Sequence, residues 1–436
     1  MDSLLVTLGV VILIFSLLGV GTWIFAGLVL VAIGSLVLMG DFNFQRVGVT
    51  LSRILFRAGN SWELSAIPLF IFMGELIFRS DISERLFKGL EPWAAKIPGG
   101  ILHTNVLGCT LFAAVSGSSA ATTATIGKIT TNELKARGYD RQLSIGSLAG
   151  AGSLGLLIPP SIVMIVYGVQ AEVSISKLFM AGILPGLLIA ALYISYIVCV
   201  SLLDPTKAPS DHRSDPISAW QSCKLLSPIL LLIFIVIGSI YSGIATPSEA
   251  AAVGVAAALI LLTVERQLTW DLFRDALQAS VLSSVMVCSI LVCAALLATA
   301  VGYLHIPQEL ASTIATMHLS PALLILILAI FYIVLGLFLD GISITVMSLP
   351  IMLPLVVQAG FDPLWFGIFL VIMVELGQIT PPVGFNLFVL QGLTGESMGR
   401  VALAAMPFFL LMCFSAVLIS IFPIIVTWLP DLVMSQ

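Results

Sequence analysis

The chain has 436 residues, 59% of them hydrophobic and only 9% charged, with a formal net charge of −5. This composition excludes an ordinary soluble domain and indicates a polytopic membrane protein, since apolar stretches of span length recur from Leu4 to Leu429. No Walker or Rossmann glycine pattern is present, so neither nucleotide chemistry nor a nucleic-acid partner is expected.

The cysteines and histidines show no pattern of metal ligands or disulfides. Five of the six cysteines lie in apolar segments, and the four histidines have no ligand spacing. We therefore interpret the cysteines as small packing residues. The first residues also lack the basic segment with which a cleavable signal begins.

The first half of the chain alternates apolar spans with two more polar segments. In order, we expect two spans, an amphipathic stretch, a third span, a polar arm, a helix pair, a broken helix and a closing span, at 4–20, 22–40, 43–58, 62–78, 81–97, 99–137, 141–170 and 178–203. The helix pair meets at a run of small polar residues from Ser116 to Gly127, and the broken helix contains Pro159-Pro160. The same order recurs at 225–242, 246–264, 266–279, 280–303, 305–319, 320–359, 363–392 and 401–428.

A constant offset relates the two halves. Five pairs of motif residues lie 222 positions apart: Gly138 and Gly360, Asp140 and Asp362, Gly155 and Gly377, Pro159 and Pro381, and Pro160 and Pro382. The same offset pairs Gly21 with Gly243 and Ser118 with Asp340. An ungapped run of identities of this kind indicates an internal duplication.

The duplication divides the chain into two repeats, 1–203 and 224–430, joined by a polar linker at 204–223. Each repeat has scaffold spans, a hairpin with a broken helix, and a closing span, at 1–98, 99–170 and 178–203, and at 224–319, 320–392 and 401–428.

The distribution of lysine and arginine predicts how the repeats are oriented. The arm and exit of the first helix pair carry eight basic residues: Arg79, Arg85, Lys88, Lys96, Lys128, Lys135, Arg137 and Arg141. Between Arg274 and Arg400 there is none. The positive-inside bias then places the ends of the first pair and the linker in the cytoplasm, and the ends of the second pair outside. Each pair becomes a re-entrant hairpin, so we predict an all-α polytopic membrane protein of two inverted-topology repeats.

One feature disagrees with the charge bias. The symmetry places three arginines of the amphipathic stretch outside, Arg46, Arg53 and Arg57. We keep the symmetry, because an amphipathic surface helix can hold arginines at either interface.

The first hairpin tip carries six small residues: Ser116, Gly117, Ser118, Ser119, Thr122 and Thr123. A tip of this kind offers free carbonyls and hydroxyls, hard oxygen ligands that suit Na⁺, and a helix N-terminus that favours an anion. The alternative is a packing seam, because small residues let membrane helices approach closely. The functional interpretation is favoured by the repeat and by the later break.

Both broken helices contain a di-proline. Proline removes a donor and clashes with the preceding turn, so carbonyls near Gly155, Pro159, Gly377, Thr380, Pro381 and Pro382 lose their partners. We expect these carbonyls to complete an ion cage beside each tip. A simple kink is the alternative, and two kinks at equivalent positions favour ion or substrate sites.

An acid stands at the second tip. Asp340 could ligate Na⁺ or cap the helix that begins near Gly341, and the sequence leaves both roles open. Glu375 in the second broken helix could serve the same cavity or form a salt link, whereas Glu75 and Glu249 are interpreted as interfacial or structural.

The predicted substrate-binding set comprises Ser116, Gly117, Ser118, Ser119, Thr122, Asp340, Gly341, Thr380 and Pro381. The predicted Na⁺ set comprises Ser118, Ser119, Thr123, Gly155, Pro159, Asp340, Gly377, Thr380 and Pro382. No catalytic residue is expected. The candidate cavity at the tips holds no lysine or arginine, so hydroxyls, helix N-termini and bound Na⁺ are expected to meet the charge of an anionic substrate.

Several motifs together resemble the large membrane subunit of tripartite ATP-independent periplasmic (TRAP) transporters. They are SGSSAATTATIG, KARGYD, GLLIPPSIVMIVYG, LGLFLDG, LPIMLPLV, GFDPLWFG and ITPPVGFNLFVLQG, and the resemblance covers essentially the whole chain. It implies an elevator-type permease of the bacterial inner membrane that imports an organic acid with Na⁺ and needs no organic cofactor. The acid is delivered by a soluble periplasmic binding protein, and the class of acid is open among C4-dicarboxylates, sialic acid, other sugar acids and keto acids.

The resemblance also implies a small four-helix membrane subunit, which is expected to be a separate chain here. A stand-alone ion-coupled dicarboxylate carrier of similar architecture is the alternative within transport. An intramembrane hydrolase would use Ser118 or Ser119 as nucleophile, but the nearest candidate base, Lys128, lies at the wrong depth. A purely structural membrane scaffold is disfavoured by the two polar breaks.

Overall fold

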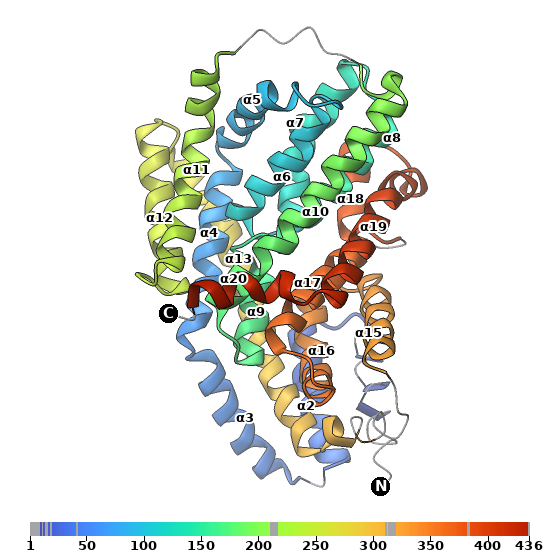
Figure 1. The fold of residues 1–436 in the computed structure, drawn as a ribbon. Helices are drawn as coiled ribbons and strands as arrows, with labels where there is room; N and C mark the ends of the chain where they lie inside the picture. Colours follow the sequence, from blue (N-terminus) through green and yellow to red (C-terminus); the bar gives the residue numbers. More distant parts are fainter. Residues whose placement is uncertain are drawn as a thin grey trace.

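A computed structural model describes residues 9–10, 12–13, 16–17, 20–40, 42–209, 217–309, 312, 320–381 and 384–434. Within these residues every regular element is a helix, and the molecule is elongated (Figure 1). Six of the described helices are long and apolar enough to cross a membrane, or seven if one bent pair is a single span. The described part of the chain is thus an all-helical, multi-span fold.

The helices follow the predicted order. In the first half they are α2 (Ile24–Leu38), α3 (Phe44–Gly59), η1 (Trp62–Ser65), α4 (Ala66–Phe78), α5 (Ile82–Ala94), α6 (Leu102–Ser116), α7 (Ser119–Ala136), α8 (Arg141–Gly152), η2 (Ser153–Leu156), α9 (Ile162–Ala171) and α10 (Ile175–Leu203). In the linker and the second half they are η3 (Pro205–Lys207), α11 (Ala219–Tyr241), α12 (Pro247–Val264), α13 (Trp270–Tyr303), α15 (Pro321–Gly336), α16 (Gly341–Gln358), α17 (Pro363–Gln378), α18 (Phe385–Thr394), α19 (Met398–Ile421) and α20 (Ile424–Met434). The span predicted at 4–20 and the polar arm predicted at 305–319 fall largely outside the described residues.

The offset of 222 is visible in the backbone. Helices α7 and α16 both have 18 residues, and their first residues, 119 and 341, differ by 222. Gly138 and Gly360 both adopt positive φ, at 78° and 87°, a conformation that glycine reaches without strain. Asp140 and Asp362 then cap α8 and α17 by accepting backbone N–H groups. Equivalent residues therefore end and begin equivalent helices.

The halves differ between their second and third spans. In the first half α3 and the η1–α4 segment are bent by 54°. In the second half the predicted boundary between 266–279 and 280–303 is absent, because α13 runs unbroken for 34 residues. The first half has Gly59 and Asn60 at this point, both poor helix formers, whereas α13 has no glycine or proline near 280.

The closing span expected at 401–428 is also divided. Helix α19 ends at Ile421, and α20 begins at Ile424. Phe422 between them has φ −121° and ψ 74°, and it precedes Pro423, whose ring disfavours helical geometry at the preceding residue. The proline therefore ends the span early.

Basic residues from different segments of the chain lie at the two ends of the molecule. At the upper end in Figure 1, Arg85 on α5 pairs with Glu265 after α12 at 2.7 Å, and Arg137 pairs with Glu91 at 2.6 Å. The linker joins this end, where the carbonyl of Lys207 accepts the backbone amide that precedes α8. Helix α3, with three arginines, lies toward the lower end. The basic residues of the first helix pair and the linker therefore lie at one end, and α3 lies at the other.

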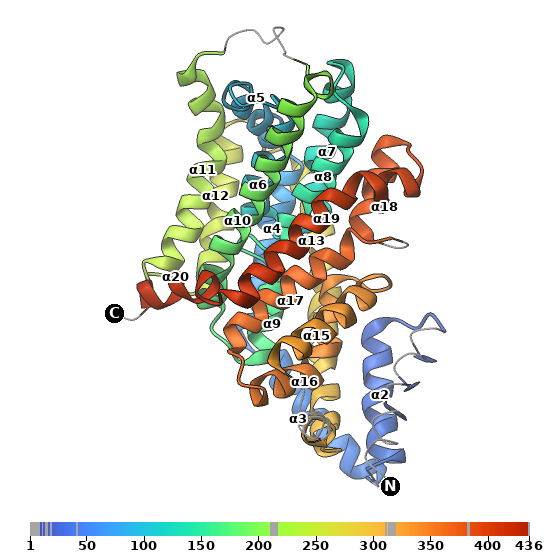
Figure 2. The ribbon, with the colours of Figure 1, turned by 45° about the vertical axis from the view of Figure 1, so that its right-hand side comes forward.

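The two helix pairs also lie toward different ends. Figures 1 and 2 both show α6 and α7 in the half nearer the linker, and α15 and α16 in the half nearer the N-terminus. The partner of each second hairpin arm comes from the other half of the chain: α7 packs against α18, and α16 packs against α9. The two halves are thus interleaved through equivalent pairs of helices.

Two glycines form the contact between α15 and α17. A methyl group on Gly336 would lie 3.2 Å from the carbonyl carbon of Gly377 and nearer still to its Cα. Small residues allow such a close approach of membrane helices, which gains van der Waals contact along the backbone.

We expect Gly336→Ala to lower the free energy of unfolding by about 1–3 kcal/mol, because the added methyl group overpacks this contact. Thermal unfolding of the purified protein in detergent measures the change. Gly302→Ala is the control, since its methyl group would contact nothing within 4 Å. Equal midpoints for the two variants would contradict the proposed role of the glycine contact.

Candidate functional site

A buried polar cluster forms where the first hairpin tip meets the second broken helix. Glu375 on α17 is 0% exposed. Its Oε1 accepts the backbone amide of Leu156 in η2 at 2.9 Å, and its Oε2 lies 2.9 Å from Ser119 Oγ on α7. The cluster therefore joins residues that are more than 200 positions apart in the chain.

Ser119 is the centre of this cluster. Its hydroxyl also lies 2.9 Å from the carbonyl oxygen of Gly152 and 2.6 Å from Nδ2 of Asn386, the second residue of α18. Asn386 is 0% exposed, and its Oδ1 has no hydrogen-bond partner among the described residues. The first tip, the first break and the helix after the second break thus meet at one serine.

Glycine allows the break to reach the tip. A Cβ on Gly155 in η2 would lie 2.7 Å from the backbone nitrogen of Ser119, so only glycine fits without a shift. At the tip itself, Gly117 has φ 58° and ends α6 in the left-handed conformation. The predicted proximity of Ser119 and Gly155 is therefore present in the structure.

The other hydroxyls of the first tip bond within the tip. Thr122 Oγ1 donates to the carbonyl of Ser118 at 2.8 Å and lies 2.8 Å from Ser116 Oγ. Thr123 Oγ1 donates to the carbonyl of Ser119 at 2.9 Å. Ser118 caps α7 by accepting the amide of Ala121. These hydroxyls satisfy local backbone groups, as serine and threonine commonly do in helices.

The second tip is built differently. Asp340 is exposed and caps α16 by accepting the backbone amides of Ile342 and Ser343 at 3.1 and 3.4 Å, and it also bonds the Ser343 hydroxyl. The capping role that the sequence left open is therefore filled in this conformation. A Cβ on Gly341 would lie 3.1 Å from Nε2 of Gln378 and 3.3 Å from Leu156, so the start of α16 lies beside both breaks.

The second break is less enclosed than the first. Thr380 Oγ1 donates to the carbonyl of Leu376 at 2.5 Å, and the Thr380 carbonyl accepts the amide of Gly384. Pro381 is exposed, whereas Pro159 and Gly377 are buried. Pro382 lies outside the described residues.

The predicted sets omitted two members of the buried cluster. The sequence analysis expects Glu375 to serve the tip cavity or form a salt link but leaves it out of both sets, and it does not include Asn386. The signal available for both is a polar side chain inside an apolar helix, which is costly unless it has a partner. The contact itself links positions 256 and 267 apart, so no local pattern reports it.

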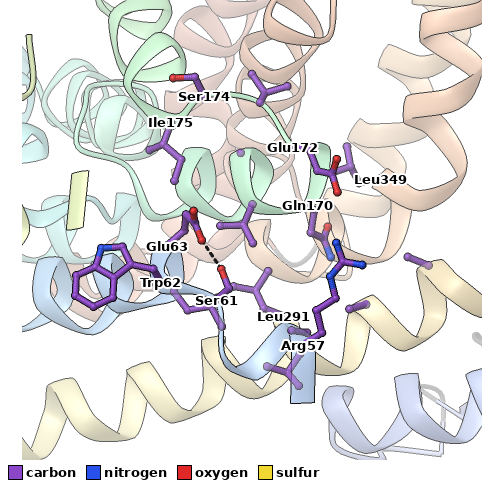
Figure 3. Close-up of a pocket in the computed structure, with 18 of the residues that line it drawn as sticks. Arg57, Ser61, Trp62, Glu63, Gln170, Glu172, Ser174, Ile175, Leu291 and Leu349 are labelled. Atoms are coloured by element: carbon purple, nitrogen blue, oxygen red, sulfur yellow. Dashed lines mark hydrogen bonds between the residues drawn. The ribbon is translucent and has the colours of Figure 1, made fainter. Parts of the chain in front are cut away.

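The large cavity of the structure lies elsewhere, between the bend after α3 and the turn from α9 to α10 (Figure 3). It has a volume of about 1010 Å³ and is also lined by the start of α12, by α13 and by α16. Its polar lining includes Arg57, Ser61, Glu63, Gln170, Glu172, Ser174, Ser176, Thr246, Ser248 and Thr299. No residue of either predicted set lines it.

A basic side chain lines this cavity, which the sequence analysis did not anticipate. Arg57 extends toward Gln170 in Figure 3 and forms no ion pair within the described ranges. Gln170 Oε1 is buried and has no described hydrogen-bond partner. Two carboxylates, Glu63 and Glu172, share the lining, and Glu63 accepts the Ser61 hydroxyl at 2.5 Å. Among the described residues, the cavity lining thus contains one guanidinium that forms no ion pair, together with two carboxylates.

The capping role of Asp340 at the second tip can be tested with two substitutions. Asp340→Ala should lower the free energy of unfolding by about 1 kcal/mol, because it removes the N-cap. Asp340→Ser should stay within a few tenths of a kcal/mol of the wild type, since serine caps equally well and stands at the equivalent position 118. Thermal unfolding in detergent without Na⁺ compares the two, and an equal loss in both would contradict the capping role.

Comparison with known proteins places this chain in a family. A family model for the "Tripartite ATP-independent periplasmic transporter, DctM component" matches residues 10–425. The chain is 36% identical over 377 residues to the C4-dicarboxylate TRAP transporter large permease protein DctM of Pseudomonas aeruginosa, covering 86% of each chain. It is 33% identical to the isethionate TRAP transporter permease protein DctMQ of Oleidesulfovibrio alaskensis, covering 90% of this chain and 61% of that relative.

The fold has a counterpart among solved structures. The YdaH transporter of Alcanivorax borkumensis superposes with a TM-score of 0.64 at 13% identity, over 87% of this chain and 88% of that one. At this identity the likeness concerns the fold alone, which is that of an all-helical, multi-span transporter. Together with the match over residues 10–425, it shows that this chain is a multi-pass membrane protein of the DctM family, the large permease component of TRAP transporters, and not an enzyme.

Proposed function

We propose that this permease imports an organic acid anion together with Na⁺ across the bacterial inner membrane. The anion is delivered by a soluble periplasmic binding protein, and the permease works with a small four-helix membrane subunit. The observation that carries the proposal is the family match over residues 10–425. The relatives are described as transporters of C4-dicarboxylate and isethionate, which are both organic anions.

The small subunit is a separate chain in this proposal. The chain spans only 61% of the length of the DctMQ permease, so that relative contains further sequence that this chain does not match. Such additional sequence supports a second membrane component that works with the matched part.

Na⁺ coupling is supported by the arrangement at the tips. The first tip brings the Ser119 hydroxyl and the Gly152 carbonyl within 2.9 Å, and Gly155 lies against the same turn. Hydroxyl and carbonyl oxygens of this kind are the ligands that a Na⁺ site in a broken-helix transporter uses. We assign Na⁺ to both tips and their breaks, with Asp340 able to turn from its cap toward the ion.

The two helix pairs are proposed to be inverted re-entrant hairpins in a mobile domain, formed by 99–170 and 320–392. Their positions toward opposite ends of the molecule support this, as does the exchange of partners by α7 and α16. The scaffold is formed by 1–98 and 224–319, and substrate crosses as the mobile domain slides against it in an elevator motion.

The cavity between α3 and α9 is proposed as the vestibule through which substrate passes before it reaches the tips. It lies where scaffold residues of α3, α12 and α13 face mobile residues of α9 and α16. Arg57 supplies a cation that has no described partner, so it can attract a carboxylate or sulfonate while the anion is still hydrated.

Uptake by reconstituted proteoliposomes tests the proposal. An inward Na⁺ gradient, the small subunit and the loaded binding protein should all be required. Ser118→Ala, Thr380→Ala and Asp340→Asn should weaken the dependence on Na⁺, whereas Ser227→Ala on the exposed face of α11 should not. Robust uptake of free substrate by this chain alone would favour a stand-alone carrier, and full transport driven by a proton gradient without Na⁺ would contradict Na⁺ coupling.

The inverted hairpins have their own test. Ala136 and Gln358 are the last residues of α7 and α16, both are exposed, and they lie 222 positions apart. Single cysteines there avoid the positive φ of Gly138 and Gly360. In a background without the exposed Cys199 and Cys223, a membrane-impermeant maleimide should label position 358 in intact cells and position 136 in inverted vesicles. Labelling of both from one side would rule out the inversion.

A further inference from the structure

The carboxylates that line the large cavity outnumber its cations. Arg57 is the one lysine or arginine in the described lining, whereas Glu63 and Glu172 both face the same space. None of the three belongs to an ion pair among the described residues. A ligand with one acid group therefore finds a single guanidinium to pair with, and a second acid group would find only carboxylates.

Most hydroxyls of the lining have already used their proton. Four of the six hydroxyls in the described lining donate to protein oxygens at 2.5–3.4 Å, namely those of Ser61, Thr246, Ser248 and Thr299. A serine or threonine hydroxyl has one proton, so these four can accept a hydrogen bond from a ligand but cannot donate one without breaking a bond they now make. The described lining is therefore rich in acceptors, and the guanidinium is its strongest donor.

The turn after α9 supplies two further acceptors. Gln170 Oε1 is buried without a described partner, and the Arg57 side chain extends toward Gln170 (Figure 3). Glu172 follows two residues later with φ 54°, a conformation that residues other than glycine rarely adopt. An acceptor that has lost water without gaining a donor is costly, so a ligand that donates to Gln170 removes this cost. Arg57 and Gln170 thus require opposite groups on one ligand: an acid and a donor.

We propose that the cavity selects an organic monoanion that carries hydroxyl groups, with Arg57 binding the acid group and Gln170 and Glu172 accepting the hydroxyls. This inference rests on the proposed role of the cavity as the vestibule for substrate. A carboxylate or sulfonate accepts two parallel N–H bonds from a guanidinium. A dicarboxylate would bring its second charge against Glu63 or Glu172 and would leave Gln170 Oε1 without a donor, so it should bind about tenfold more weakly.

Protection of Arg57 from phenylglyoxal, a reagent that modifies guanidinium groups, measures occupancy of the site at one residue. The purified permease in detergent is treated with the reagent in the presence of potassium gluconate, butyrate or succinate, and peptide mass spectrometry quantifies the modified Arg57. Gluconate, a monoanion with hydroxyls, should protect at about tenfold lower concentration than succinate, a dianion, or butyrate, a monoanion without hydroxyls. Arg53 is the internal control, because it is exposed on the same helix outside the cavity lining, and its reaction should not change.

A substitution separates charge from shape. Glu172→Gln keeps the size of the side chain and removes the like charge, so succinate should protect Arg57 about tenfold better than in the wild type. Glu84→Gln, at an exposed position of α5 outside the cavity lining, should leave all three probes unchanged. Equal protection by gluconate and succinate in the wild type, or no protection by either, would overturn the proposal.

This measurement needs neither Na⁺, the binding protein nor the small subunit. Its failure is therefore distinguishable from a failure of the proposed transport function. Na⁺-driven uptake without the preference at Arg57 would overturn the inference about the cavity alone. The preference at Arg57 without Na⁺-driven uptake would support that inference and contradict only the coupling.

Discussion

The structure depends on how a helix break is satisfied away from water. A break in an apolar segment exposes backbone groups, and these are tolerated only where protein or a hydrated cavity meets them. Here the break at η2 is met from both halves of the chain: α7 supplies the Ser119 hydroxyl to the Gly152 carbonyl, and α17 supplies the Glu375 carboxyl to the Leu156 amide. The break is therefore stabilised only when the two halves are packed together, which couples the local backbone to the whole fold.

The duplication gives both halves the same arrangement of helices, and sequence differences between the halves give the two tips different side chains. Equivalent residues end the hairpins, cap the following helices and set their lengths. Within that frame, Ser118 caps one tip with a neutral hydroxyl and Asp340 caps the other with a charge. The first break is enclosed by Glu375 and Asn386 from the second half, but the residues at 153 and 164 that occupy the equivalent positions are Ser153 and Met164. The two tips thus lie at equivalent positions in the chain and carry different capping side chains.

The sequence predicted the helices well because their limits are set locally. Small residues, prolines and caps act within a few positions, and they mark the ends of both helix pairs and the two breaks. The linker predicted at 204–223 is too long, because α11 begins at Ala219. The prediction was wrong at 279–280, where we expected one helix to end and another to begin. No glycine or proline interrupts α13 there, so the helix continues. The candidate site was predicted in part: Ser119 and Gly155 do meet, but Glu375 and Asn386 reach Ser119 from positions 256 and 267 residues away. The cavity with Arg57 was missed for the same reason, because three of its walls come from separate parts of the chain.

The distribution of charge along the path follows from these contacts. At the cavity, Arg57 and two carboxylates face a space of about 1010 Å³, where water can screen their charges. At the buried cluster, no lysine or arginine among the described residues forms an ion pair with Glu375. On the path proposed above, an anionic substrate that moves from the cavity to the tips would leave behind both the screening by water and the Arg57 guanidinium. In the proposed mechanism, Na⁺ bound at the tips would balance the charge of the anion there, which gives a physical reason for coupling the two.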